Sequence, residues 1–267
     1  MKKMLNFLMM LCVMFFCTGM ELCAAGEALP PQTDAVSVNA LAEQPEVHHY
    51  TIYVNKAWNC ITVMDTDASG NEIPVRAFAC SCGRSGYTTP SGTFQTSNYY
   101  VWQEMVDGSY ARYAVRFAPH MLLHSVPYYT RNVNDLEYNQ YNKLGGPASR
   151  GCIRLSVADA KWIYENTTPS TKVVIYYDET SPGPLGKPEP IRIDTSSPYR
   201  GWDPTDIDPN NPWLAVYGIT PEYLAFDELA YAAAYPDLMA AFGTNKQMLW
   251  NHYLTYGMAE GRVAVFH

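Results

Sequence analysis

Positive charge is scarce in this chain, where 18 Lys and Arg stand against 26 Asp and Glu and the formal net charge is −8. An acidic protein repels the phosphate backbone, so we exclude nucleic acid as a partner. Charged residues make up only 16% of the 267 residues and apolar residues 48%, which is the composition of a folded protein rather than a disordered one.

A long membrane-spanning run is also lacking, because the apolar stretch from Leu5 to Met20 is short for a span. Lys2 and Lys3 precede this stretch, and small residues follow it at Cys23-Ala24-Ala25. This order is typical of a secretion signal, which we assign to residues 1–25. We therefore expect a secreted or cell-wall-associated protein, held at a membrane only if the signal stays uncleaved as an anchor.

Zinc-type cysteine spacing is absent after the signal. Cys80 and Cys82 are separated by one residue rather than two, so we predict no metal site. Cys60 and Cys80 lie on adjacent predicted strands, which makes a disulfide between them conceivable. With Cys152 the chain outside the signal has four cysteines, and one disulfide, two disulfides and four thiols all stay open.

The remaining chain divides into four parts. Residues 26–47 are a polar, proline-bearing leader that we predict to be flexible. Residues 48–178 contain segments such as YTIYVN and NCITVMD, which predict a mostly β domain. In that domain the capping-box sequence Ser156-Val157-Ala158-Asp159 opens one prominent amphipathic helix, VADAKWIYEN.

Proline and acidic residues crowd residues 179–212, which we predict to be a linker. Residues 213–267 carry helical periodicity with predicted stops at Gly243 and Gly257, and predict a small α-helical C-terminal module of two or three helices. This module resembles short helical modules appended to secreted bacterial proteins.

The chemistry that the residues suggest centres on Cys152 and His124. A thiol reacts as its thiolate, and a neighbouring imidazole can take its proton. Gly151 lets the backbone approach a ligand, so the amides at Gly151 and Cys152 are candidates for binding an oxyanion. Arg154 points to the side of Cys152 if the segment is extended, and can then hold a substrate carboxylate. The alternative is that Cys152 is an ordinary buried apolar residue.

The spacing of His120 and His124 suits a metal pair only on a helix. The surrounding residues predict a strand, where four residues span about 13 Å, too far for one ion. We therefore expect His120 to face solvent.

The segments FAPHMLLHSVPYY and GGPASRGCIRLSVADAKWIY resemble the L,D-transpeptidase catalytic domain of the YkuD type. His124-Ser125 is similar to the family's His-Gly/Ser element, and Ser149 with Gly151–Arg154 is similar to its Ser-His-Gly-Cys-Ile-Arg/Asn element. TTPSGTF and VRAFACSCG are similar to the turn and strand that come earlier in the family. The resemblance covers about residues 48–178.

The resemblance implies a β-sandwich fold and a two-step acyl transfer on peptidoglycan peptide stems. Cys152 would attack the bond before the terminal D-Ala of a tetrapeptide stem, with His124 as base and the Ser125 carbonyl orienting the imidazole. The amides around Gly151 and Cys152 would form the oxyanion hole. The acyl group would then pass to an amine of a second stem. The family needs no metal or organic cofactor, and carbapenem-type inhibitors are expected to acylate its cysteine.

Two departures from the family pattern bear on the site. Arg150 stands where the family has histidine, and it either lowers the pKa of Cys152 or lies on the surface. The stretch between His124 and Ser149 is long, and its Tyr128, Tyr138 and Tyr141 either contact a glycan-peptide strand or pack the loop onto its own domain. The candidate substrate-binding residues are Arg154, Ser149, Arg150 and Tyr128.

Two other functions compete with transpeptidation. In the first, an L,D-carboxypeptidase uses water instead of an amine as the acceptor. In the second, a non-catalytic peptidoglycan-binding protein keeps the fold but has lost the chemistry through Arg150.

Overall fold

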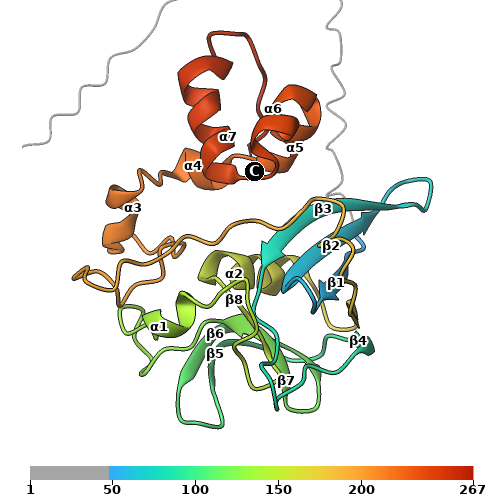
Figure 1. Cartoon of the computed structure of the whole chain (residues 1–267), viewed down its shortest axis with the longest axis vertical. Helices are drawn as coiled ribbons and strands as arrows, with labels where there is room; N and C mark the ends of the chain where they lie inside the picture. Colours follow the sequence, from blue (N-terminus) through green and yellow to red (C-terminus); the bar gives the residue numbers. More distant parts are fainter. Residues whose placement is uncertain (1–47, 267) are drawn as a thin grey trace, which may run out of the picture. The chain divides into compact units, whose positions relative to one another are not determined.

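Segments rich in β-branched and aromatic residues form two β-sheets (Figure 1). The structure is a computed structural model that describes residues 48–266, so the predicted signal and leader lie outside it. The first sheet has the order β3-β2-β1-β9-β4 and consists of β1 (Thr51–Asn55), β2 (Cys60–Thr66), β3 (Glu72–Ala79), β4 (Gly92–Gln95) and β9 (Lys172–Tyr176). The second has the order β5-β6-β7-β8 and consists of β5 (Tyr99–Glu104), β6 (Tyr110–Ala118), β7 (Met121–Ser125) and β8 (Ile153–Leu155).

Each sheet contains one parallel pair among antiparallel pairs. In the first sheet β1 runs parallel to β9, and in the second β7 runs parallel to β8. A parallel pair needs a long crossover, and the chain between β7 and β8 includes the short helix α1 (Tyr138–Tyr141). This crossover brings two segments that are distant in sequence to adjacent positions in one sheet.

Helix α2 (Val157–Asn166) follows β8 directly. The Ser156 hydroxyl accepts a hydrogen bond from the Asp159 amide at 3.2 Å, which satisfies one of the free amides of the first turn. Val157, Ala160 and Ile163 recur on one side of the helix and are buried.

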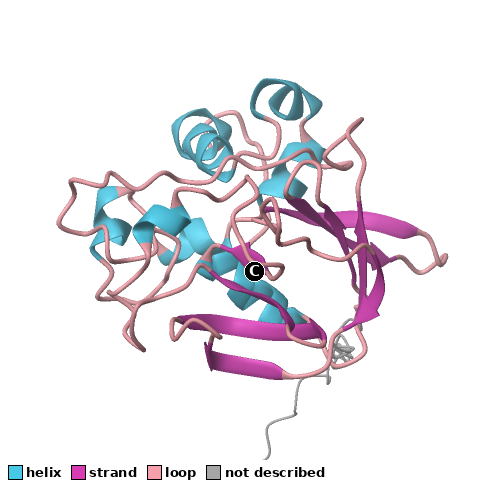
Figure 2. Cartoon of the chain, turned by 60° about the horizontal axis from the view of Figure 1, so that its bottom comes forward, coloured by secondary structure: helices cyan, strands magenta, loops and turns pink. Residues whose placement is uncertain are grey.

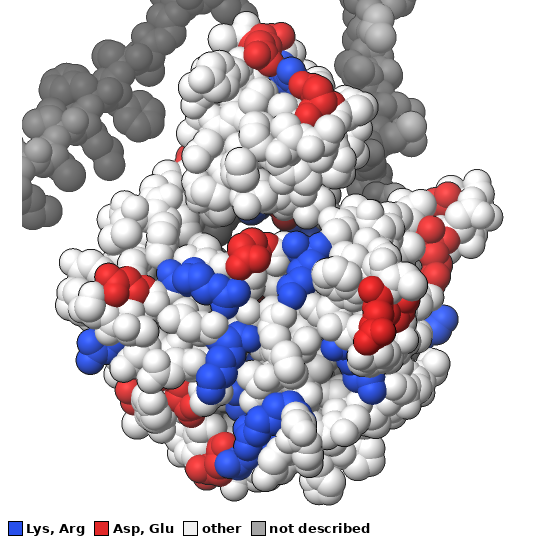
Figure 3. Space-filling model, in the orientation of Figure 1, with Lys and Arg blue, Asp and Glu red and all other residues white. Residues whose placement is uncertain are grey.

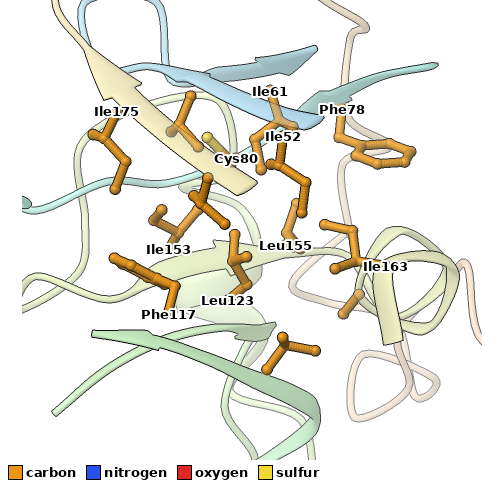
Figure 4. Packing of buried hydrophobic residues seen from close by; sticks show 14 of the residues in the cluster. Ile52, Ile61, Phe78, Cys80, Phe117, Leu123, Ile153, Leu155, Ile163 and Ile175 are labelled. Carbon is orange, nitrogen blue, oxygen red and sulfur yellow. The ribbon is translucent and has the colours of Figure 1, made fainter. Parts of the chain in front are cut away.

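The main core lies between the two sheets and α2, and Figure 2 shows the strands as two groups with helix close by. Complete burial of one such aliphatic side chain contributes about 1.5–3 kcal/mol, so this cluster is a major source of stability. Figure 4 shows its packing, with side chains from both sheets and from α2: Ile52, Ile61, Phe78, Cys80, Phe117, Leu123, Ile153, Leu155, Ile163 and Ile175.

A second cluster packs the long loop after β7 onto the domain. Tyr128 is 0% exposed and Tyr141 is 1% exposed, and the Tyr128 ring meets the Trp102 ring at a centroid distance of 5.4 Å. Tyr138 packs against the same cluster at its edge. The prediction of Tyr128 as a substrate contact is therefore wrong, because its ring is buried in this cluster.

The proline-rich segment after β9 also lies against the domain. Ile193 is buried in the second cluster, and the Asn142 side chain donates to the Ile193 carbonyl at 2.8 Å. Lys187 donates to the carbonyl of Gly145 at 2.5 Å. This part of the predicted linker is ordered by specific contacts.

Short helices make up the C-terminal part, several with a polar residue at the start whose side chain accepts from an amide of the first turn. Phe226, Tyr231 and Trp250 are buried in a third cluster, and Arg76 of β3 lies 3.5 Å from Glu228. The elements are α3 (Pro212–Val216), α4 (Pro221–Ala225), α5 (Glu228–Ala234), α6 (Pro236–Phe242), α7 (Lys246–His252) and the π-helix η1 (Tyr253–Gly257). Among residues 48–266, no helix is long and apolar enough to cross a membrane.

Cys60, Cys80 and Cys82 are buried, unpaired thiols. The conceivable disulfide between Cys60 and Cys80 is therefore absent, although β2 and β3 pair as expected and place Cys60 opposite Ala79. Within the described range, no group of three or more His, Cys, Asp or Glu side chains is arranged to hold a metal ion. On the face shown in Figure 3, basic and acidic side chains lie interspersed among uncharged ones.

Candidate active site

Strand pairing places the candidate catalytic residues on one face of the second sheet. The parallel register sets His124 of β7 beside Arg154 of β8, and Leu123 beside Ile153. Side chains alternate between the faces of a strand, so Cys152, two residues before Arg154, points to the same side as His124. His124, Cys152 and Arg154 all line one pocket.

The tautomer of His124 follows from a hydrogen bond to the chain itself. Its Nδ1 lies 2.6 Å from the Ser125 carbonyl oxygen, which can only accept, so Nδ1 carries the proton. Nε2 is then the unprotonated nitrogen, and it has no hydrogen-bond partner in the described part of the chain. The ring is thus held in one tautomer, with a free lone pair on Nε2.

Burial and charge keep this imidazole neutral. His124 is 1% exposed, and burial together with the Arg154 guanidinium lowers its pKa to about 4, against the opposing effect of the Ser125 carbonyl and Asp107. A neutral imidazole at physiological pH is able to accept a proton.

Cys152 is partly exposed at the pocket, and its Sγ lies 3.7 Å from the His120 carbonyl oxygen. Burial raises the pKa of its thiol, while the Leu122 amide and the charges of Arg154 and Arg116 act in the opposite direction. The resting site therefore holds a neutral thiol and a neutral imidazole. The thiolate has to form by proton transfer at the moment of reaction.

The turn before Cys152 is held by hydroxyl groups. Gly151 has a φ of +119°, and a side chain there would bring a Cβ within 2.9 Å of the Met121 methyl carbon. The Gly151 amide donates to Ser149 Oγ at 3.0 Å, and Ser149 Oγ in turn donates to the Cys152 carbonyl. Thr89 donates to the Gly151 carbonyl at 2.8 Å.

These bonds change the expected roles of two residues. The Gly151 amide already has a partner, so in this arrangement it is not free to bind an oxyanion as the family resemblance implies. Ser149 is buried at the pocket wall, and its hydroxyl supports the turn rather than pointing to a ligand.

The two arginines differ in their surroundings. Arg154 donates to Gln140 Oε1 at 2.9 Å and lies 3.4 Å from the Ala148 carbonyl, which fixes its guanidinium beside His124. Arg150 is exposed and lies 3.3 Å from Asp107 Oδ2. Arg150 thus lies on the surface, which was the second alternative that its sequence position allowed. The charges that lower the pKa of Cys152 come chiefly from Arg154 and Arg116.

Sequence reasoning missed the residues that the β5–β6 hairpin contributes. Glu104, Asp107 and Ser109 line the pocket beside Cys152, and Arg116 of β6 joins them. Nothing in the local sequence marks these residues, because only the pairing of β5, β6 and β7 carries them to the pocket. His120 is exposed as expected, in the turn between β6 and β7, and also lines the pocket.

A base-competent histidine on β7 and a cysteine in the turn just before β8, open to one pocket, form the type of site that cysteine-dependent acyl transfer requires. Residues 49–175 match the family model of the L,D-transpeptidase catalytic domain, YkuD. This part of the chain is therefore an L,D-transpeptidase catalytic domain, as its motifs predict.

Several known proteins are similar to part of this chain. The chain is 41% identical over 93 residues to "Putative L,D-transpeptidase YciB" of Bacillus subtilis (strain 168), a match that covers 33% of this chain and 46% of that relative. The chain thus spans less than half of the relative's length. Among solved structures, L,D-transpeptidases from Mycobacterium tuberculosis H37Rv and Mycobacterium smegmatis are 23% and 20% identical, with TM-scores of 0.38 and 0.39. Each match covers 48% of this chain, and 58% and 59% of the respective structures.

Proposed function

We propose that this protein is a secreted L,D-transpeptidase that cross-links cell-wall peptide stems. The observation that carries the proposal is the hydrogen bond from His124 Nδ1 to the Ser125 carbonyl, which leaves Nε2 unprotonated on a residue that lines the same pocket as Cys152. A base in this tautomer is what a thiol nucleophile needs. The family match of residues 49–175 supports the reaction class.

In the first step His124 Nε2 takes the Cys152 proton, and the thiolate attacks the carbonyl before the terminal D-Ala of a donor stem. D-Ala leaves with a proton returned from the imidazole, and a thioester forms on Cys152. The Cys152 amide is the remaining candidate for stabilising the oxyanion, since the Gly151 amide is engaged by Ser149. Burial together with Arg154 keeps the imidazole neutral, and Arg154 adds positive charge beside the thiolate.

In the second step an amine of another stem attacks the thioester and releases the thiol. If water attacks instead, the same site works as an L,D-carboxypeptidase. A non-catalytic wall-binding protein is the third candidate, and the base-competent tautomer of His124 argues against it. Extracytoplasmic localisation rests on the signal predicted for residues 1–25.

The test is the intact mass of the full-length protein after incubation with a carbapenem. We expect one covalent adduct on wild type and none on Cys152→Ala, which retains the buried thiols Cys60, Cys80 and Cys82 as an internal control. Incubation with a disaccharide-tetrapeptide then separates the reactions, since dimers indicate transfer and tripeptides alone indicate hydrolysis. A folded wild-type protein that forms no adduct but sediments with insoluble peptidoglycan would favour the binding protein.

A further inference from the structure

A transpeptidase has to bring a cationic acceptor to its thioester, and one carboxylate of the pocket is placed for that task. Asp107 lies in the turn between β5 and β6 and lines the pocket together with Cys152, His124 and Arg154. An amine acceptor arrives mainly as its ammonium at neutral pH. A fixed anion beside the acylated cysteine would raise its local concentration.

The Asp107 carboxylate is oriented by its own turn. Ser109 donates to Oδ1 through its hydroxyl at 2.7 Å and through its amide at 3.3 Å. Oδ2 is left to face Arg150, whose NH1 lies 3.3 Å away. These bonds and the Arg150 charge hold the pKa of Asp107 below its usual range, so the group is ionised at neutral pH.

The ion pair between Arg150 and Asp107 Oδ2 is weak. The side chains of Arg150 and Asp107 are 50% and 38% exposed, and an exposed pair of this kind is stabilised by less than about 1 kcal/mol. Another cation can therefore replace the guanidinium at little cost. Arg154 is different, because Gln140 and the Ala148 carbonyl hold it in place.

We propose that Asp107 Oδ2 binds the ammonium group of the acceptor stem, and that Arg150 holds this position in the absence of substrate. The inference rests on the proposed function, since only an acyl-enzyme has an acceptor. Asp107 is a binding residue for the second substrate, and acylation by the first does not require it.

The bound ammonium releases one proton to solvent, and the neutral amine attacks the thioester carbonyl. The C–N bond forms and the C–S bond breaks. The second proton passes from nitrogen to His124 Nε2 and then to the Cys152 sulfur, which restores the thiol.

The experiment measures partition of the acyl-enzyme in the full-length protein, with a disaccharide-tetrapeptide as both donor and acceptor. The ratio of dimer to tripeptide is determined by mass spectrometry over a range of substrate concentrations, and carbapenem acylation is timed separately. For Asp107→Asn we expect the ratio to fall about tenfold, the effect of losing a charged hydrogen-bond partner. Acylation should proceed at about the wild-type rate, since Asp107 raises the pKa of both the Cys152 thiol and the His124 imidazole, and its removal affects the two ends of the proton transfer in opposite directions.

Glu104→Gln is the matched control. Glu104 precedes the same turn and lines the same pocket, so the substitution removes an equal charge without touching the Arg150 partner. We expect its dimer-to-tripeptide ratio to equal that of wild type. Asp107→Glu retains the carboxylate and should recover most of the transfer.

Arg150→Ala distinguishes an acceptor site from a structural ion pair. If the pair only held the hairpin, loss of either partner would shift partition in the same direction. An acceptor site predicts opposite directions, because Arg150→Ala frees Oδ2 and should raise the ratio several-fold at low acceptor concentration. An equal dimer-to-tripeptide ratio in wild type and Asp107→Asn would overturn the acceptor site. A ratio that falls in both Asp107→Asn and Arg150→Ala would overturn it as well. A wild type that forms no acyl-enzyme would overturn the proposed function and this inference with it.

Discussion

The pH dependence of Cys152 alkylation tests how the site generates its nucleophile. Burial raises the pKa of the thiol above the ordinary value of 9.0 and lowers that of His124 to about 4, so both partners are neutral between those values. Iodoacetamide reacts with the thiolate. The rate should therefore follow the small fraction of thiolate at each pH.

The magnitude follows from the ionisation equilibrium. A thiol with a pKa of 9.0 is about 1% thiolate at pH 7, and a raised pKa makes this fraction smaller still. The rate should then rise about tenfold per pH unit from pH 6 to pH 9, without a lower inflection. Arg154→Gln removes a charge that favours the thiolate, so its rate at pH 8 should be lower than that of wild type.

The assay follows the loss of unmodified protein by intact mass under excess reagent. Cys152→Ala gives the background from the buried thiols Cys60, Cys80 and Cys82. A rate that stays level from pH 5 to pH 8 would refute the reasoning, because it would mean that a thiolate and an imidazolium already exist at rest.

Three further variants test the packing. Gly151→Ala should lower stability by about 1–3 kcal/mol and slow carbapenem acylation, because the residue has a φ of +119° and its new Cβ would displace the end of the Met121 side chain. An unchanged melting temperature would contradict this. Tyr128→Phe should leave the dimer-to-tripeptide ratio unchanged and alter the free energy of unfolding by no more than about 1 kcal/mol, since the ring is buried against Trp102 and away from the pocket. A selective loss of turnover in this variant would show that Tyr128 contacts the substrate after all. Burial raises the pKa of Asp159 to about 7, so its neutral form stabilises the fold at low pH, and this contribution is lost as pH rises through 7. In urea unfolding, Asp159→Asn should therefore be more stable than wild type at pH 8, by up to about 4 kcal/mol, and as stable as wild type near pH 4.

The sequence by itself determined the chemistry of the pair at the centre of the site. Segments rich in β-branched and aromatic residues specify strands, and the Ser156 capping box specifies the start of a helix, because these signals depend on neighbours within a few residues. The motifs around His124 and Cys152 predict the L,D-transpeptidase catalytic domain that the family match confirms for residues 49–175.

Only the tertiary structure decided which surface each remaining residue meets. The sequence leaves open whether Tyr128 contacts a ligand or packs its loop, and the second cluster buries it. The Gly151 amide has no partner that its sequence position reveals, and in the fold it donates a hydrogen bond to Ser149. Asp107 lies 43 residues before Arg150, and strand pairing alone brings it to the pocket. Burial, hydrogen-bond partners and charge pairs depend on contacts distant in sequence, whereas the identity of a nucleophile and its base is a property of the residues themselves.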